Sequence, residues 1–128
     1  MGHFHVDCEI THVRNPKKSA KVTRLLVDTG SEWTWIAADT LKALGVKVEK
    51  KDQPFLMANG ATITRSIGFA VLAADGFRTV DEVVFAQPGD LQLLGARTME
   101  GFGAMVDPRK KRLVASGPIP AAGVQSRT

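Results

Sequence analysis

Apolar and polar residues alternate in short segments along most of the chain, and turn residues separate these segments. A period of two is typical of strands with one buried face, so a mostly β protein is predicted. In the first segment, alternation places on one face Phe4, Val6, Cys8 and Ile10. Asn15-Pro16 predicts a turn, because proline has no amide donor for a strand ladder. Residues 22–27 form the next predicted strand and end in Leu25-Leu26-Val27, an apolar run that suits burial on both faces.

Two glycine-containing turns predict β-hairpins farther along the chain. Asn59-Gly60 is expected at the tip of a hairpin that spans residues 55–67, since Asn-Gly is a strong short-range hairpin signal. A second hairpin is expected to run from residues 69–72 through Asp75-Gly76 into residues 80–85.

Two short helices are predicted among the strands. The first spans residues 36–44, with Gly45 where a C-cap is expected, and the second spans residues 96–102. Further short strands are predicted at residues 91–94, 104–107 and 112–114. One domain over residues 1–115 is therefore expected, followed by an irregular tail, residues 116–128, that is rich in Gly, Pro, Ala and Ser.

The composition narrows the possible partners. A hydrophobic fraction of 44% suits a folded protein, and no apolar run is long enough to cross a membrane. The net charge of +4 comes largely from Lys17-Lys18 and residues 109–112, which lack interleaved aromatics, so solvated turns are favoured over a nucleic-acid surface. The first residues lack a secretory signal and Cys8 is the single cysteine, so a cytoplasmic protein is expected.

The segment most informative about chemistry is Asp28-Thr29-Gly30-Ser31, which directly follows the apolar strand. This order places a carboxylate at a strand end, where the chain must turn sharply. Gly30 permits the turn and leaves its amide free to approach the carboxylate. A plain loop is the competing interpretation, because Asp and Gly are also common turn formers.

The wider order of motifs resembles the aspartic peptidases, and most closely their small prokaryotic, retropepsin-like members. An apolar strand, Asp28-Thr29-Gly30 and the small Ser31 match their active-site signature. Met57, Ala58, Asn59 and Gly60 occupy the place of a substrate-binding flap. Leu93-Leu94-Gly95, followed by a short helix, matches the segment that passes beside the catalytic loop, the psi-loop. The resemblance spans residues 22–114 and implies the closed β-barrel half of the acid-protease fold, hydrolysing peptide bonds without a cofactor.

Several residues depart from the retroviral pattern. Ala96 stands where the viral enzymes carry an arginine that supports the dimer, and Arg97 comes one place later. The flap tip has one glycine where viral flaps have several. Trp33 and Trp35 have no counterpart that we can assign; core packing is the favoured role for at least one, and a pocket or interface is open to the other.

One Asp-Thr-Gly implies two chains, because the chemistry uses two carboxylates that share a proton around a water molecule. At Asp75, Asp81 and Asp107 the sequence does not combine a buried apolar strand before the aspartate with a glycine two residues after it. The pair is therefore expected from a two-fold homodimer in which Asp28 meets Asp28 of the second copy. Thr29 is expected to bond across to the partner, and a peptide or protein substrate to lie extended under the flaps.

Other functions compete with this one. A metal site would use His3, His5, Cys8 and His12, but alternation puts the first two on the opposite strand face from the others, and no metal is expected. A cysteine on an apolar face is usually inert, and Ser31 lacks the setting of a serine hydrolase. The alternative from another class is a catalytically weak or inactive peptide-binding or dimerisation module with the same fold.

Overall fold

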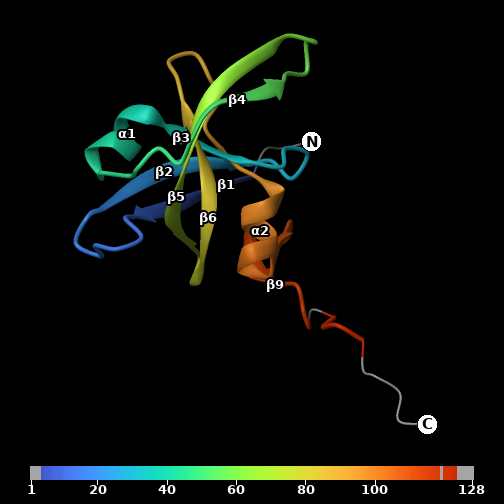
Figure 1. The fold of residues 1–128 in the computed structure, drawn as a ribbon. Helices are drawn as coiled ribbons and strands as arrows, with labels where there is room; N and C mark the ends of the chain where they lie inside the picture. Colours follow the sequence, from blue (N-terminus) through green and yellow to red (C-terminus); the bar gives the residue numbers. More distant parts are fainter. Residues whose placement is uncertain (1–3, 119, 124–128) are drawn as a thin grey trace.

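The computed structural model describes residues 4–118 and 120–123, and strands make up most of it (Figure 1). The mostly β class predicted from the alternating pattern is confirmed. In chain order the elements are β1 (Phe4–Thr11), β2 (Ser19–Val27), β3 (Thr34–Ala37), α1 (Ala38–Ala43), β4 (Lys50–Leu56), β5 (Thr62–Ala74), β6 (Phe77–Ala86), β7 (Leu93–Leu94), α2 (Ala96–Phe102), β8 (Ala104–Asp107) and β9 (Arg112–Ala115).

The main sheet has seven strands and closes on itself. Its order is β1-β2-β7-β3-β6-β5-β4, and β1 also pairs with β5, which makes the sheet ring-like. Within the ring, β7 runs parallel to β2, and β3 runs parallel to β6. The remaining strand, β4, pairs with β5, and the two extend from the ring as a hairpin (Figure 1). Strands β8 and β9 form a separate two-stranded sheet beside α2.

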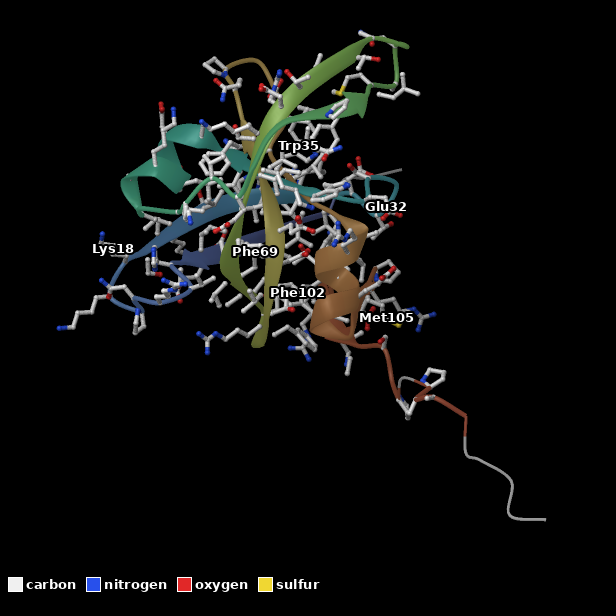
Figure 2. The ribbon with its side chains drawn as sticks, viewed as in Figure 1. Lys18, Glu32, Trp35, Phe69, Phe102 and Met105 are labelled. Atoms are coloured by element: carbon white, nitrogen blue, oxygen red, sulfur yellow. The ribbon has the colours of Figure 1, made fainter. Side chains whose placement is uncertain are left out.

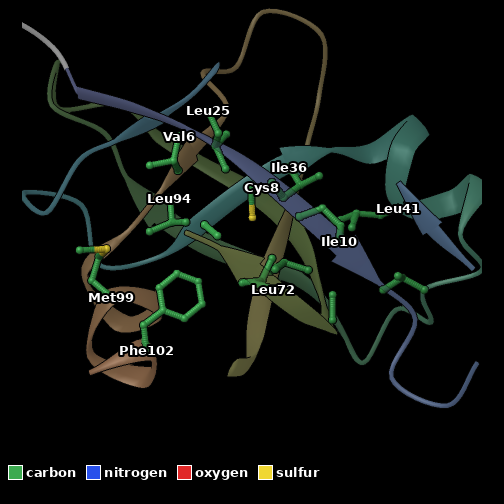
Figure 3. Close-up of a cluster of buried hydrophobic side chains, with 14 of the residues drawn as sticks. Val6, Cys8, Ile10, Leu25, Ile36, Leu41, Leu72, Leu94, Met99 and Phe102 are labelled. Carbon is green, nitrogen blue, oxygen red and sulfur yellow. The ribbon is translucent and has the colours of Figure 1, made fainter. Parts of the chain in front are cut away.

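Two apolar clusters explain why several strands are apolar at consecutive positions. Because side chains alternate across a strand, Leu25, Ile36 and Leu94 point into the larger cluster, whose other members include Cys8, Leu72 and Phe102 (Figure 3). Their neighbours Leu26, Trp35 and Leu93 point into the second cluster. The two-sided burial predicted for residues 25–27 is confirmed in this form, with Leu25 buried and Leu26 and Val27 partly buried.

The predicted turns are confirmed. At the second hairpin, Asp75 and Gly76 both have positive φ, 50° and 86°, as a two-residue hairpin loop of the favoured twist requires. Strand β5 is longer than predicted and serves both hairpins. The basic Lys17-Lys18 and residues 109–111 lie exposed in turns, as expected for solvated charges.

One predicted helix boundary is wrong. The helix expected over residues 36–44 begins at Ala38, because Ile36 and Ala37 pair with Phe85 and Ala86 as part of β3. Ile36 is fully buried, so its place in the ladder outweighs the helical pattern that predicted residues 36–44. The strand expected over residues 91–94 is also shorter and comprises only Leu93 and Leu94. Residues 116–118 and 120–123 have no helix or strand, and residues 119 and 124–128 of the predicted tail lie outside the described residues.

Candidate active site

Asp28 lies where two parallel strands end together. Its strand, β2, pairs with β7 through Leu26–Leu93 and Val27–Leu94. The amide of Asp28 then donates to the carbonyl oxygen of Leu94 at 2.9 Å, which carries the pairing one residue past the strand. The predicted catalytic residue and the predicted psi-loop are therefore neighbours.

Two backbone amides of the loop after Asp28 donate hydrogen bonds to Asp28. The amide of Gly30 donates to Oδ1 of the Asp28 carboxylate at 3.0 Å, and the amide of Ser31 donates to its carbonyl oxygen at 3.1 Å. Asp28 is partly buried, whereas Thr29 and Gly30 are exposed in the single chain. The hydrogen bond from the Gly30 amide to Oδ1 fixes the orientation of the carboxylate and leaves Oδ2 free to interact with another group.

Gly95 brings the start of α2 against this loop. A Cβ at this position would overlap the carbonyl oxygen of Trp33 and lie 2.7 Å from that of Glu32, so glycine is required for the close approach. The next two amides, of Ala96 and Arg97, donate to the carbonyl oxygens of Ser31 and Glu32 at 2.7 and 3.0 Å. The loop is thus held from behind by backbone bonds.

The predicted flap is the β4–β5 hairpin. The amide of Met57 donates to the carbonyl oxygen of Ala61 at 2.8 Å, and the amide of Gly60 donates to that of Met57 at 2.9 Å. The Asn59 side chain accepts a bond from the amide of Ala61 at 2.9 Å. These bonds form a closed turn with Asn59 and Gly60 exposed at its tip.

The predicted flap and the Asp28 loop border one cavity of about 570 Å³. It is lined by Asp28, Gly30, Ser31, Glu32, Trp33, Trp35, Phe55, Leu56, Met57, Ala58, Gly89, Asp90, Leu91 and Leu93. Of the predicted site residues, Thr29, Asn59 and Gly60 lie outside this lining, and Leu94 and Gly95 support it from behind. The structure thus brings together the predicted carboxylate and the base of the predicted flap.

The two tryptophans connect the flap to the loop. Phe55 of β4 packs edge-on against Trp33 with 5.8 Å between ring centroids, and against Trp35 with 5.1 Å. Figure 2 shows Trp35 beneath the flap and Glu32 beside the start of α2. Trp35 is 7% exposed and packs in the second apolar cluster, but both tryptophans also line the cavity, so core packing alone, the role favoured for at least one of them, describes neither.

A family model described as aspartyl protease matches residues 17–101. The chain belongs to the aspartyl protease family. The family is of the retropepsin-like type, so the resemblance seen in the sequence is confirmed. The matched segment contains Asp28, the flap hairpin and the Leu93-Leu94-Gly95 segment of this aspartyl protease. No curated protein matches the sequence.

Sequence reasoning missed a buried hydroxyl chain behind the catalytic loop. Thr34 accepts a bond from the amide of Gly95 at 2.9 Å, and its hydroxyl lies 2.6 Å from that of Thr98. Thr98 donates to Asp81 at 2.8 Å, so the hydroxyl of Thr34 must donate to Thr98. Both threonines are fully buried. Thr34 and Thr98 are 64 residues apart, and a threonine carries no periodic signal that would have paired them.

We expect Thr98→Val to lower the free energy of unfolding by about 2 kcal/mol, because it leaves Asp81 and Thr34 without their shared partner. Thr98→Ser is the matched control, since it keeps the hydroxyl and loses only a methyl group. Urea unfolding of both variants measures the difference. A valine variant as stable as the serine variant would show that these hydroxyl hydrogen bonds contribute nothing to the free energy of unfolding.

Arg97 supports the loop from another side. Its guanidinium lies 4.3 Å from the centre of the Trp33 ring and 3.2 Å from Oε1 of Glu82. Lys50 of β4 lies 3.0 Å from the other carboxylate oxygen of Glu82. Burial opposes ionisation of Glu82, but the cationic groups of Lys50 and Arg97 outweigh it and lower the pKa of this carboxyl. The arginine beside this loop is therefore Arg97, one position after the place where the viral enzymes carry theirs.

The competing chemistries gain no support from the described residues. Burial raises the pKa of the Cys8 thiol to about 12, which makes it a poor nucleophile and a poor metal ligand. Within residues 4–118 and 120–123, no group of three or more His, Cys, Asp or Glu is placed to hold a metal ion. His3 of the considered metal set lies outside these residues. In the same part of the chain, no helix is both long and apolar enough to cross a membrane.

Proposed function

We propose that this aspartyl protease is an endopeptidase that works as a homodimer, with one Asp28 from each copy at the two-fold axis. The observation that supports this best is the position of Asp28, whose carboxylate borders a cavity also bordered by the flap. The chain has one Asp-Thr-Gly, so a second copy is the natural source of the second acid. The exposed Thr29 is available to bond across the axis in such a dimer. A cytoplasmic location is part of the same proposal.

The proposed reaction is general acid–base hydrolysis. One Asp28 carboxylate, ionised, takes a proton from water as the water oxygen attacks the peptide carbonyl carbon, while the other, protonated, donates to the carbonyl oxygen. The tetrahedral intermediate then collapses and the C–N bond breaks. The leaving amine takes the proton that the first carboxylate removed from water, and the second carboxylate takes a proton back from a hydroxyl of the intermediate, which restores the starting pair. The hydrogen bond from the Gly30 amide to Oδ1 keeps each Asp28 carboxyl group in one orientation during these steps.

The cavity lining supports an extended substrate with apolar side chains next to the scissile bond. Trp33, Trp35 and Leu93 are among its lining residues, and two others, Leu56 and Leu91, are 77% and 70% exposed in the single chain. Such exposed apolar side chains are typical of surfaces that bind a partner. The flap tip at Asn59 and Gly60 would then pair with the substrate backbone.

Digestion of a peptide library, with the dimer mass measured by sedimentation at the same concentration, tests this function. We expect a dimer, and cleavage sites enriched in Leu, Phe or Met on at least one side of the broken bond. A chain that stays dimeric and binds peptides without cleaving any would instead support a binding module.

A further inference from the structure

A bidentate ion pair joins the flap to the segment between β6 and β7. Nε and a terminal nitrogen of Arg65 lie 2.7 and 2.8 Å from the two carboxylate oxygens of Asp90. The two side chains are only 19% and 11% exposed. A parallel pair of charge-assisted bonds fixes the orientation of both groups as well as their distance.

Each partner is also tied to its own segment. The Asp90 carboxylate also accepts a third hydrogen bond, from the amide of Gln87 at 2.8 Å, and the amide of Asp90 donates to the carbonyl oxygen of Gln87 at 2.9 Å. Arg65 donates to the carbonyl oxygen of Thr64 at 2.8 Å. A displacement of either side chain would therefore move the backbone of its segment.

The two joined segments are both walls of the cavity beside Asp28. The flap contributes residues 55–58, and the segment after β6 contributes Gly89, Asp90 and Leu91. Arg65 stands opposite Gln53 in the β4–β5 ladder, two positions from the Phe55–Ile63 pair, so it belongs to the same two-stranded ribbon as the cavity residues. The ion pair thus connects one wall of the cavity to the other.

We propose that Arg65 and Asp90 are positioning residues that couple the flap to the wall formed by residues 87–91, so that both walls open and close together. This inference rests on the proposed peptidase function for its kinetic part. The described contacts of Asp28 are to Gly30, Ser31 and Leu94 and do not involve the pair. Loss of the pair should therefore weaken substrate binding and raise KM, while kcat changes little.

Hydrogen exchange of the full chain tests the coupling without any substrate. We expect Arg65→Gln to speed amide exchange in residues 87–92, and Asp90→Asn to speed it in residues 55–63, each by about tenfold. Asp90→Asn keeps an oxygen to accept the Gln87 amide, so its effect on the flap isolates the loss of the Arg65 pair. Lys21→Gln is the matched control, because the Lys21–Asp7 pair is 66% and 54% exposed and lies at the far end of β2.

Peptide kinetics on the same variants test the consequence for the cleft. We expect KM to rise about tenfold in each single variant, kcat to stay within about twofold, and the double variant to match the singles. Arg65→Lys keeps the positive charge but cannot make the bidentate contact, so its KM should lie between those of the wild type and Arg65→Gln. It replaces Arg65→Gln if that variant does not fold.

Faster exchange confined to the mutated side, additive effects in the double variant, or a fall in kcat at constant KM would each overturn the coupling. A wild-type chain that cleaves no peptide would contradict the proposed function only, since the exchange result decides the coupling by itself.

Discussion

Asp28→Asn is expected to reduce kcat for peptide cleavage by at least about 10³-fold, because an amide can neither take a proton from water nor donate one to the substrate. The fold should survive the change. Asn keeps the Oδ1 that accepts the Gly30 amide, and the bond from the Asp28 amide to Leu94 is a backbone bond. The loss should therefore be one of chemistry alone, measured as kcat on a fluorogenic peptide.

Circular dichroism and sedimentation provide the control for this variant. Both should match the wild type, since neither the loop nor any buried contact is removed. Residual cleavage near the wild-type rate would show that Asp28 is not the acid or base, and the mechanism would have to be abandoned.

Gly95→Ala should destabilise the protein by about 3 kcal/mol or more, because the added Cβ overlaps backbone atoms that no side-chain rotation can move. It would lie against the carbonyl oxygen of Trp33, 2.6 Å from its carbonyl carbon and 2.7 Å from the carbonyl oxygen of Glu32. Relief requires the loop and α2 to separate, which breaks the backbone bonds from Ala96 and Arg97. Chemical unfolding measures the loss, and cleavage should fall with it.

Gly123→Ala is the matched control for this change. A Cβ at Gly123 would meet nothing within 4 Å, so its unfolding free energy should equal that of the wild type. If Gly95→Ala were equally harmless, α2 would not be held against the catalytic loop as described.

The alternating pattern predicted most of the strands, and the two apolar clusters of the ring-like sheet explain the runs that do not alternate. Consecutive apolar residues such as Leu25-Leu26 and Leu93-Leu94 send one side chain to each cluster, which is why both positions of these segments are apolar. The Asp28 loop, the flap tip and the Leu93-Leu94-Gly95 segment were predicted from motifs whose chemistry depends on local order. Ile36 was misassigned because the helical pattern of residues 36–44 competes with a ladder to Phe85, and only the fold decides between them.

The side chains that support the site could not be predicted in the same way. Thr34 and Thr98, Arg97 and Trp33, and Arg65 and Asp90 are partners across long stretches of chain. Their hydrogen bonds and ring contacts depend on which elements become neighbours, and neither threonine nor arginine marks this with a periodic pattern. A buried polar side chain becomes informative only after its neighbours are known.

Mixing wild-type chain with the Asp28→Asn chain tests the shared pair most directly. After subunit exchange with an equal amount of the variant, the activity of a fixed amount of wild-type chain should fall to about half, since only wild-type pairs carry two acids. A larger excess of the variant should drive it toward zero. Activity that stays unchanged however much variant is added would contradict the account, because one chain would then suffice.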